Sequence, residues 1–363
     1  MRQIIKQFYM WLITISNIIF RWRKVQKDHV VVCMTFPSDV LPLIRALHAQ
    51  GKRITVIAKP SDVDILKPFA GIQCIPAGNK YVLKQMYALS VAKVIIIDTY
   101  YLMFGGFKKK RGQYVLQTWH AAGALKTFGF EDHQVDMNNA RMVAQYRRVY
   151  DTTDYYFVGG APMVTCFKGA FDVTDEQCVR VGLPRMETYK HVDVNAQQQA
   201  LKSQLGITGR VVLYVPTYRE HQTANRRIDA HAFKQAFPND TLIQRLHPSV
   251  QNSADTCELD TQSLMIMADI IVTDYSSLAI EASYIHKPVV HYVYDEADYA
   301  SARGLNTFYY AIPEQYKAYD EATLFDRLTT KMDLQPQFDA WHTYTTAHSL
   351  EESMTFIERL MKS

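Results

Sequence analysis

The sequence lacks the short motifs that build the commonest nucleotide-binding and hydrolytic sites. No Gly-x-Gly-x-x-Gly follows a predicted strand, and there is no Walker phosphate loop, no Gly-x-Ser-x-Gly elbow and no His-Glu-x-x-His pair. An Asp62-Val-Asp64 triplet could suggest a metal-dependent glycosyltransferase, but it precedes a helical segment instead of following a buried strand. We therefore expect a solvated loop there, no metal ligands and no bound cofactor.

Cysteine is scarce and charge is nearly balanced. The five cysteines are odd in number, scattered and without a Cys-x-x-Cys pair, which indicates free thiols in a reducing cytosol and argues against a zinc site. The formal charge of +4 is small for 363 residues, so the totals do not indicate nucleic-acid binding. With 48% hydrophobic and 21% charged residues, the chain has the composition of a folded protein, and it is long enough for two α/β domains.

A long uninterrupted apolar run is also missing, although the N-terminus comes close to one. Only 14 uncharged residues separate Lys6 from Arg21, whereas a membrane-spanning helix needs about 20. Trp and Phe on one side and Arg and Lys on the other are typical of a helix that lies in the interface of an anionic membrane. Residues 1–24 therefore predict an amphipathic helix, whose apolar face carries Ile4, Ile5, Phe8, Trp11, Leu12, Ile15, Ile18, Ile19 and Trp22.

Two alternatives for this helix stay open at the level of the sequence: an uncleaved signal-anchor, and a helix that docks on the protein's own core. No small-residue cleavage site follows the apolar run, which argues against a removed signal peptide. We expect peripheral attachment to the cytoplasmic face of the cell membrane. The basic run within Phe107-Lys-Lys-Lys-Arg111 is an alternative attachment point, although a solvated loop is its simpler interpretation.

From His29 onward, short β-branched runs alternate with helical segments. This alternation predicts α/β domains with open parallel sheets, and the pattern restarts after a polar helix at 197–205. We expect two doubly wound, Rossmann-like domains, 25–195 and 196–335, with a cleft between them. Residues 324–363 read as helical, with 336–363 as a C-terminal helix. The expected strands are Val30–Met34, Ile54–Ala58, Val94–Asp98, Val115–Thr118, Tyr155–Val158, Cys178–Val181, Val211–Val215, Thr241–Leu246, Ile270–Thr273 and Val289–Tyr292.

Polar side chains follow four of these strands, at the ends where parallel sheets bind ligands. Each group is weak evidence alone, because a lone histidine after a strand is more often structural. Ser276 and Ser277 could simply cap the following helix, but a helix start also offers free N–H groups to an anion. Together, two histidines, one arginine and several hydroxyls suit a phosphate-bearing substrate. The four groups are Trp119-His120, Pro216-Thr217-x-Arg219, His247-Pro248 and Thr273-Asp274-Tyr-Ser276-Ser277.

The order of these motifs, together with Lys287-Pro288 and Tyr292-Val-Tyr-Asp295, resembles the CDP-glycerol glycerophosphotransferase family, the teichoic acid enzymes of Gram-positive bacteria. The resemblance covers about residues 30–330. It implies a GT-B fold, peripheral membrane attachment and metal-independent transfer of glycerol phosphate from CDP-glycerol. It also implies catalytic roles for His120 and His247. The residues expected around the substrates are Trp119, Thr217, Arg219, Pro248, Thr273, Asp274, Ser276, Ser277 and Glu281.

Segment 117–132 is similar to the primase branch of this family, whereas its polymerases more often have Trp-His-Gly-Thr-Pro where this chain has Ala121 and Ala122. A primase adds the first glycerol phosphate to N-acetylmannosaminyl-N-acetylglucosamine on undecaprenyl diphosphate. The resemblance therefore implies this lipid-linked acceptor and an anionic membrane surface as partners, and no nucleic acid; a wall-synthesis complex or a homo-oligomer also fits. The alternatives are a glycerol- or ribitol-phosphate polymerase, a sugar-nucleotide glycosyltransferase and a non-catalytic membrane-bound module.

We hypothesise that a sugar hydroxyl of the acceptor attacks the β-phosphorus of CDP-glycerol and that CMP leaves. An imidazole is well matched to accept the proton near pH 7, and His120 lies in the half expected to bind the acceptor. His247, Arg219 and the helix start at Ser276 and Ser277 would then stabilise the diphosphate. Two points stay open: whether His120 only orients its loop through a hydrogen bond, and whether the serine hydroxyls or the backbone N–H groups contact the phosphate.

Overall fold

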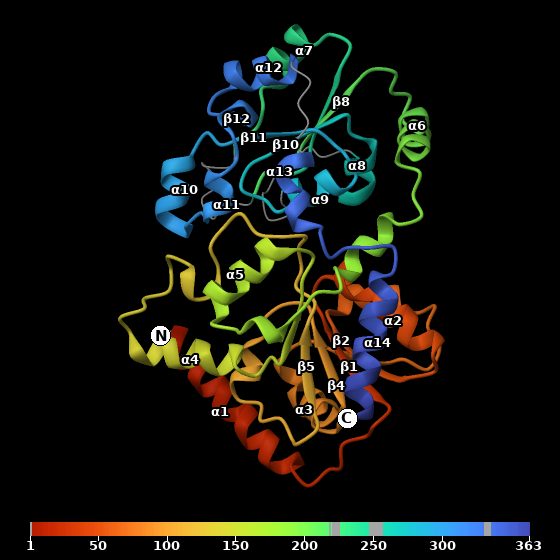
Figure 1. The fold of residues 1–363 in the computed structure, drawn as a ribbon, viewed down its shortest axis with the longest axis vertical. Helices are drawn as coiled ribbons and strands as arrows, with labels where there is room; N and C mark the ends of the chain where they lie inside the picture. Colours follow the sequence, from red (N-terminus) through yellow and green to blue (C-terminus); the bar gives the residue numbers. More distant parts are fainter. Residues whose placement is uncertain (1, 218, 220–225, 247–256, 330–334) are drawn as a thin grey trace. The chain divides into compact units, whose positions relative to one another are not determined.

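The computed structural model describes residues 2–217, 219, 226–246, 257–329 and 335–363 (Figure 1). The chain forms two compact units that do not follow the sequence in simple order. The first unit comprises Met1–His120, Gly129–Lys190 and Thr343–Ser363, and the second comprises Ala121–Phe128 and His191–His342. The division expected near residue 195 thus lies at 190/191, and each unit also takes a segment from the other side of that division.

The first unit is built on a seven-stranded sheet in which every neighbouring pair is parallel, with the order β3-β2-β1-β4-β5-β6-β7. β1 lies between β2 and β4, so that Val31 is opposite both Thr55 and Ile95. The β-branched runs of β1 and β4 are buried throughout, as expected for a parallel sheet covered on both faces. The strands are β1 (His29–Met34), β2 (Arg53–Ala58), β3 (Gln73–Pro76), β4 (Val94–Ile97), β5 (Tyr114–Gln117), β6 (Tyr155–Phe157) and β7 (Cys178–Val179).

Helices cover both faces of this sheet. α2 (Pro37–Ala49) and α14 (Ser349–Lys362) share a hydrophobic core with Val30 and Val32, alternate residues of β1. The intervening residue Val31 shares the opposite core with α1 (Arg2–Phe20) and α3 (Val82–Val91). The helices α4 (Ala140–Tyr150) and α5 (Ala161–Phe171) complete the unit.

The C-terminal region is not the continuous helix predicted for 324–363. It contains α12 (Glu321–Thr329), the short α13 (Gln335–Phe338) and α14, and residues 342–348 between the last two are not helical. This stretch holds three threonines, which have low helix propensity, and the N–H of Thr346 donates to the Ser349 hydroxyl at the start of α14. α14 packs on α2, so the chain ends in the first unit.

Helix α1 docks on the first unit through its more polar side. Met10 is buried, and Asn17 Nδ2 donates to the carbonyl oxygen of Lys108 at 3.2 Å. The helix approaches Gly106 so closely that a Cβ there would lie 2.3 Å from the carbonyl oxygen of Met10. Only glycine permits this contact without a shift of the helix.

The predicted apolar face of α1 points outward. The helix does dock on the protein's own core, which was one of the two alternatives, but it does so through its opposite side. No helix in the described part of the chain combines the length and the hydropathy needed to cross a membrane. Eight large apolar side chains remain between 37% and 84% exposed, namely Ile5, Phe8, Trp11, Leu12, Ile15, Ile18, Ile19 and Trp22.

The basic run next to α1 is not a plain solvated loop. Lys109 forms an ion pair with Asp154 at 2.5 Å. Lys110 Nζ donates to the carbonyl oxygens of Phe20 and Arg23, at 3.1 and 2.6 Å. A cation at this position satisfies free carbonyl groups at the end of α1 and interacts favourably with the helix dipole.

The second unit contains a five-stranded parallel sheet with the order β12-β11-β10-β8-β9. Its strands are β8 (Val211–Tyr214), β9 (Thr241–Gln244), β10 (Ile270–Thr273), β11 (Val289–Tyr292) and β12 (Lys317–Ala318). The predicted α/β class with parallel sheets is confirmed. β3 and β12 were not predicted, because β3 has one fully buried residue and β12 only two residues, too little for an apolar run. The helices of this unit, besides α12 and α13, are α6 (Val194–Gln204), α7 (Ala230–Ala236), α8 (Thr261–Met267), α9 (Leu278–Tyr284), α10 (Glu296–Arg303) and α11 (Thr307–Tyr310).

Candidate active site

In the first unit, Trp119 follows the end of β5 in a strained backbone conformation. Its φ of 65° lies in the left-handed region, which costs a residue with a side chain about 1–3 kcal/mol. The indole is only 5% exposed and packs edge-on against Phe167 and Phe171 of α5, with ring centroids 5.4 and 5.9 Å away. This packing holds the turn, and the turn sets the direction in which His120 leaves the strand.

His120 is held by a hydrogen bond and by ring stacking. Its Nδ1 lies 3.1 Å from the carbonyl oxygen of Asp98, and its ring stacks on Phe36 with centroids 4.7 Å apart and an interplanar angle of 18°. Because a carbonyl oxygen only accepts hydrogen bonds, Nδ1 carries the proton of the neutral ring and the basic lone pair lies on Nε2. This tautomer suits a general base, and the same bond is the one that a purely structural histidine would make.

Asp98, directly after β4, supports this arrangement. Its buried carboxylate accepts hydrogen bonds from the backbone N–H groups of Thr35 and Phe36 and from the Tyr101 hydroxyl. Burial raises the pKa of Asp98, although these hydrogen bonds act in the opposite direction. The carboxylate thereby fixes Phe36, on which His120 stacks. Asp98 is absent from the predicted site, although an acidic residue directly after a buried strand is a usable signal.

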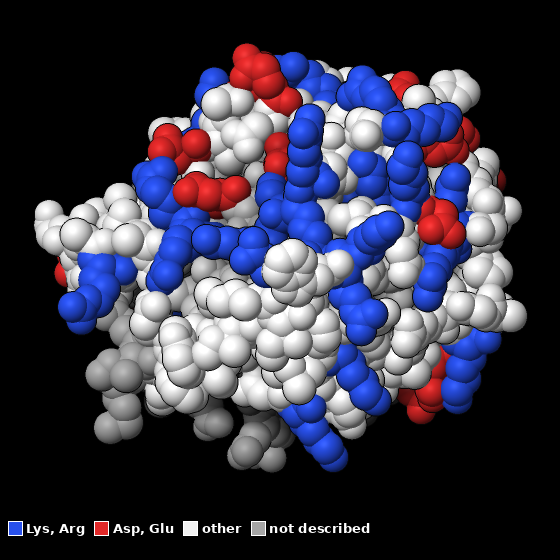
Figure 2. Space-filling view, turned by 90° about the horizontal axis from the view of Figure 1, so that it is seen from below, with Lys and Arg blue, Asp and Glu red and all other residues white. Residues whose placement is uncertain are grey.

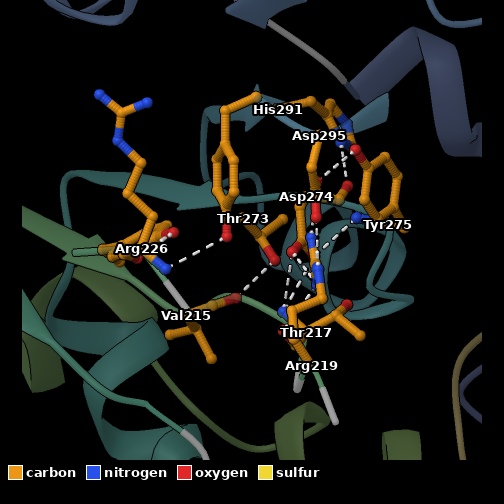
Figure 3. Close-up of polar contacts among 11 residues, drawn as sticks. Val215, Thr217, Arg219, Arg226, Thr273, Asp274, Tyr275, His291 and Asp295 are labelled. Carbon is orange, nitrogen blue, oxygen red and sulfur yellow. Dashed lines mark hydrogen bonds and ion pairs between the residues drawn. The ribbon is translucent and has the colours of Figure 1, made fainter. Parts of the chain in front are cut away.

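In the second unit, Asp274 joins the carboxyl ends of β8 and β10 (Figure 3). Both of its carboxylate oxygens lie 3.0 Å from the backbone nitrogen of Thr217, and one also accepts from the N–H of Tyr275. The Thr273 hydroxyl donates to the carbonyl oxygen of Val215 at 2.6 Å, which adds a second link between the same strands. Thr273 and Asp274 are fully buried. They build the strand ends, and a direct contact of either with the substrate stays a prediction.

The guanidinium of Arg219 forms ion pairs within its own unit. Nε and Nη2 donate to the two carboxylate oxygens of Asp295 at 2.7 and 2.9 Å, and Nη1 lies 2.9 Å from the carboxylate of Asp274. Burial opposes the charge, but these carboxylates outweigh it and raise the pKa of Arg219. Its predicted contact with the diphosphate stays a prediction, whereas its role in holding the strand ends follows from these bonds. The guanidinium is 7% exposed and lies over the rings of Tyr275, Tyr294 and Tyr299.

The predicted helix start lies at α9. Ser276 Oγ accepts a hydrogen bond from the N–H of Leu278 at 3.2 Å, so Ser276 satisfies one of the free donors of this helix. Ser277 occupies the N-cap position, but its side chain makes no capping hydrogen bond. Both serines are partly exposed, and Glu281 lies in the first turn. The cap and the proposed phosphate contact can therefore belong to different serines.

Two buried polar atoms near Asp274 have no hydrogen-bond partner within the described residues: the Thr217 hydroxyl oxygen and Nε2 of His291. His291 pairs with Thr273 across β10 and β11, and its Nδ1 lies 2.7 Å from the carbonyl oxygen of Asp274. Burial lowers the pKa of His291 to about 4. A buried polar atom without a partner is unfavourable and needs an explanation, and a bound ligand is one.

His247 and Pro248, the remaining predicted residues, lie outside the described residues, so their roles stay predictions.

Comparison with known proteins decides the family. Residues 42–344 match the family described as CDP-Glycerol:Poly(glycerophosphate) glycerophosphotransferase. The chain belongs to this family. It is 44% identical over 365 residues to the teichoic acid glycerol-phosphate primase of Staphylococcus aureus, covering 99% of this chain and 100% of that one. It is 25% identical over 385 residues to the primase of Bacillus subtilis, covering 99% of each chain.

A solved structure supports the fold of this glycerophosphotransferase. The wall teichoic acid polymerase TagF superposes with a TM-score of 0.76 over 99% of this chain and 98% of that chain. The identity is 16%, so the likeness shows a shared GT-B-like α/β fold and nothing about substrates.

The glycerophosphotransferase chain brings some predicted residues together and adds others. Thr217, Arg219, Thr273 and Asp274 form one hydrogen-bonded cluster in the second unit, whereas Trp119 and His120 belong to the first unit. Asp295 and His291 were not among the predicted site residues. Asp295 stands in the Tyr292-Val-Tyr-Asp295 motif just after β11, so its position after a strand was the available signal.

Proposed function

We propose that this glycerophosphotransferase is a wall teichoic acid primase, which transfers one glycerol phosphate from CDP-glycerol to a lipid-linked disaccharide and releases CMP. The acceptor in this proposal is N-acetylmannosaminyl-N-acetylglucosamine on undecaprenyl diphosphate. The observation that carries the proposal is the 44% identity to the Staphylococcus aureus primase over the whole length of both chains. The departure from the polymerase motif at Ala121 and Ala122 supports the same choice.

In the proposed reaction, His120 is the general base. An acceptor hydroxyl forms a bond to the β-phosphorus, its proton passes to Nε2 of His120, and the bond from the β-phosphorus to the bridging oxygen breaks. The electron pair of that bond leaves with CMP. The fixed tautomer supports this assignment, because the hydrogen bond from Nδ1 to Asp98 strengthens as the ring becomes positively charged.

The donor is assigned to the second unit, in keeping with a GT-B arrangement. The Thr217 hydroxyl, which lacks a hydrogen-bond partner within the described residues, supplies an unused donor beside Asp274. The partly exposed hydroxyl of Ser277 and the first N–H groups of α9 offer further donors to a phosphate. Phosphoryl transfer depends mainly on positioning and on stabilising charge, and a rigid cluster of strand ends suits this task.

Membrane attachment through α1 is the second part of the proposal. The outward face of α1 presents large apolar side chains, and Arg21, Arg23 and Lys24 follow directly. Figure 2 shows a face on which Lys and Arg gather in a band beside a broad area without charged side chains. Insertion of such a face into the headgroup region of an anionic leaflet would bring the enzyme to its lipid-linked acceptor.

Product length tests the primase proposal. The purified full-length chain is incubated with a lipid disaccharide acceptor and excess CDP-glycerol, and the products are resolved by mass spectrometry. We expect one glycerol phosphate per acceptor and one CMP released for each. A ladder of longer products would assign the chain to the polymerases, and turnover with CDP-ribitol alone would change the donor.

A further inference from the structure

The segment Ala121–Phe128 carries a lysine, Lys126, whose backbone is held firmly in the second unit. Lys126 forms an antiparallel bridge with Leu305. The N–H of the next residue, Thr127, donates to the carbonyl oxygen of Gly304 at 3.2 Å. These contacts place Lys126 beside the C-terminal end of α10.

Further contacts restrict the same segment. Asn306 donates through its backbone N–H to Leu125 and through Nδ2 to the carbonyl oxygen of Ala124, at 3.1 and 2.7 Å. Gly123 is packed so closely that a Cβ there would lie 2.5 Å from the ring of Trp341. The position of Lys126 is thus set by its neighbours on both sides, as is usual for a residue that must meet a ligand in a fixed place.

Charged groups of both signs act on Lys126. The groups that act on it most strongly are one carboxylate, Asp274, and two guanidinium groups, Arg303 and Arg219. Burial lowers the pKa of Lys126; Asp274 acts in the opposite direction, and the two arginines add to the lowering. Asp274 and Arg219, which hold the strand ends of the second unit, therefore lie close enough to Lys126 to act on its charge.

The carboxylate near Lys126, that of Asp274, already has hydrogen-bond and ion-pair partners. Asp274 accepts from the N–H groups of Thr217 and Tyr275 and pairs with Arg219. Within the described residues, Lys126 has neither a hydrogen bond from Nζ nor an ion pair, although the side chain is only partly exposed. A long cationic side chain held in place without an internal partner is suited to bind an anion from solution.

We propose that Lys126 is a substrate-binding residue whose ammonium group contacts the diphosphate of CDP-glycerol and neutralises the charge that develops on the departing CMP phosphate. The proposal rests on the donor assigned under the proposed function. It also gives the segment after His120 a purpose, since only five residues separate the proposed base from a cation for the leaving group. A lysine acts here as a point charge on the phosphate oxygens, with no bond made or broken at the side chain.

The test compares Lys126→Met and Lys126→Arg with a matched control, Lys234→Met, in the full chain. Lys234 lies on α7 of the same unit, and its Nζ donates to the carbonyl oxygen of Pro238. Binding of CMP is measured by calorimetry, turnover with CDP-glycerol by CMP release, and folding by thermal melting. We expect Lys126→Met to melt like the wild type, to lose about tenfold or more in CMP affinity and to lose on the order of 10²- to 10³-fold in kcat/KM. Lys126→Arg should keep most of both, and Lys234→Met should match the wild type.

Wild-type CMP affinity and kcat/KM in Lys126→Met would overturn the proposal. Equal losses in Lys126→Met and Lys126→Arg, together with a lower melting temperature in both, would also overturn it, because they would assign Lys126 a packing role. The proposed function is tested separately by the wild type. A wild type that binds CMP but does not turn over CDP-glycerol would refute the donor, while the comparison of CMP affinities would still decide the role of Lys126.

Discussion

Arg219 and Asp295 form a bidentate ion pair, in which Nε lies 2.7 Å from Oδ2 and Nη2 lies 2.9 Å from Oδ1. The pair joins the segment after β8 to the residue before α10, and the same guanidinium reaches Asp274 at the end of β10. Tyr275 adds a hydrogen bond from its hydroxyl to Asp295. A single guanidinium thus connects three strand ends, and the proposed donor site depends on their register.

Breaking this pair should destabilise the second unit. In Arg219→Lys the planar fork is lost, and in Asp295→Asn one charge is lost, so each leaves buried polar groups unmatched. We expect each change to lower the free energy of unfolding by about 3–5 kcal/mol and to reduce turnover with it. Denaturant unfolding measures the effect.

An exposed pair in the same unit is the control. Arg327 and Asp326 lie 3.1 Å apart, and the Asp326 side chain is 69% exposed, so Arg327→Lys should cost no more than about 1 kcal/mol. Comparable stability losses at Arg219 and Arg327 would contradict the role assigned to Arg219.

His120→Asn separates the two interpretations of His120. The asparagine amide can still donate to the carbonyl oxygen of Asp98, as Nδ1 does, but it has no basic nitrogen. If His120 is the base, kcat should fall by about 10²- to 10⁴-fold with little change in the KM for CDP-glycerol. Steady-state kinetics with a soluble acceptor analogue measure both constants.

Retained turnover in His120→Asn would instead support the structural interpretation, in which the hydrogen bond alone matters. His231→Asn, at an exposed position of α7, controls for the loss of a histidine elsewhere and should leave kcat unchanged.

Two buried histidines should make the fold sensitive to mild acid. Burial lowers the pKa of His29 and of His291 from 6.5 to about 4, so both are neutral in the folded chain at pH 5, whereas the unfolded chain binds protons there. Stability contributed by these groups is therefore present above pH 6.5 and is lost as pH falls toward 4. Linkage gives up to about 3 kcal/mol for each over that range.

The melting temperature between pH 7.5 and 4.5 checks this expectation. His291→Asn keeps a donor for the carbonyl oxygen of Asp274, and its melting temperature should fall less steeply with acid than that of the wild type. An unchanged slope would show that His291 does not contribute to the acid sensitivity. His231→Asn again serves as the exposed control.

The positions of most strands could be predicted because buried parallel strands leave a strong local pattern, as in Val94–Ile97. The ion pair of Arg219 could not be predicted, because its partner Asp295 is 76 residues away and nothing local specifies the pair. The sequence also could not predict that Lys126 belongs to the second unit, since this depends on its pairing with Leu305. The outward direction of the apolar face of α1 agrees with the interfacial helix that was expected, but the sequence left docking on the core open, because a hydrophobic pattern identifies an apolar face and not whether protein or lipid covers it.

Membrane attachment through α1 is best tested by substitutions in the full chain. Deleting the helix would uncover the core that Met10 and Ile13 cover, so loss of vesicle binding could reflect unfolding. Substitutions on the outward face avoid this problem. The triple variant Phe8→Ser, Trp11→Ser, Ile18→Ser changes side chains that are 55–59% exposed and should fold normally. Each of these side chains contributes on the order of 1 kcal/mol or more to interfacial partitioning, so binding to vesicles rich in phosphatidylglycerol should fall by about 10²-fold or more. Vesicle sedimentation measures the partitioning, and turnover of a soluble acceptor analogue should stay near the wild-type value. Leu205→Ser, which alters an apolar side chain 42% exposed on the second unit, is the matched control. Undiminished sedimentation of the triple variant would move the attachment site away from α1.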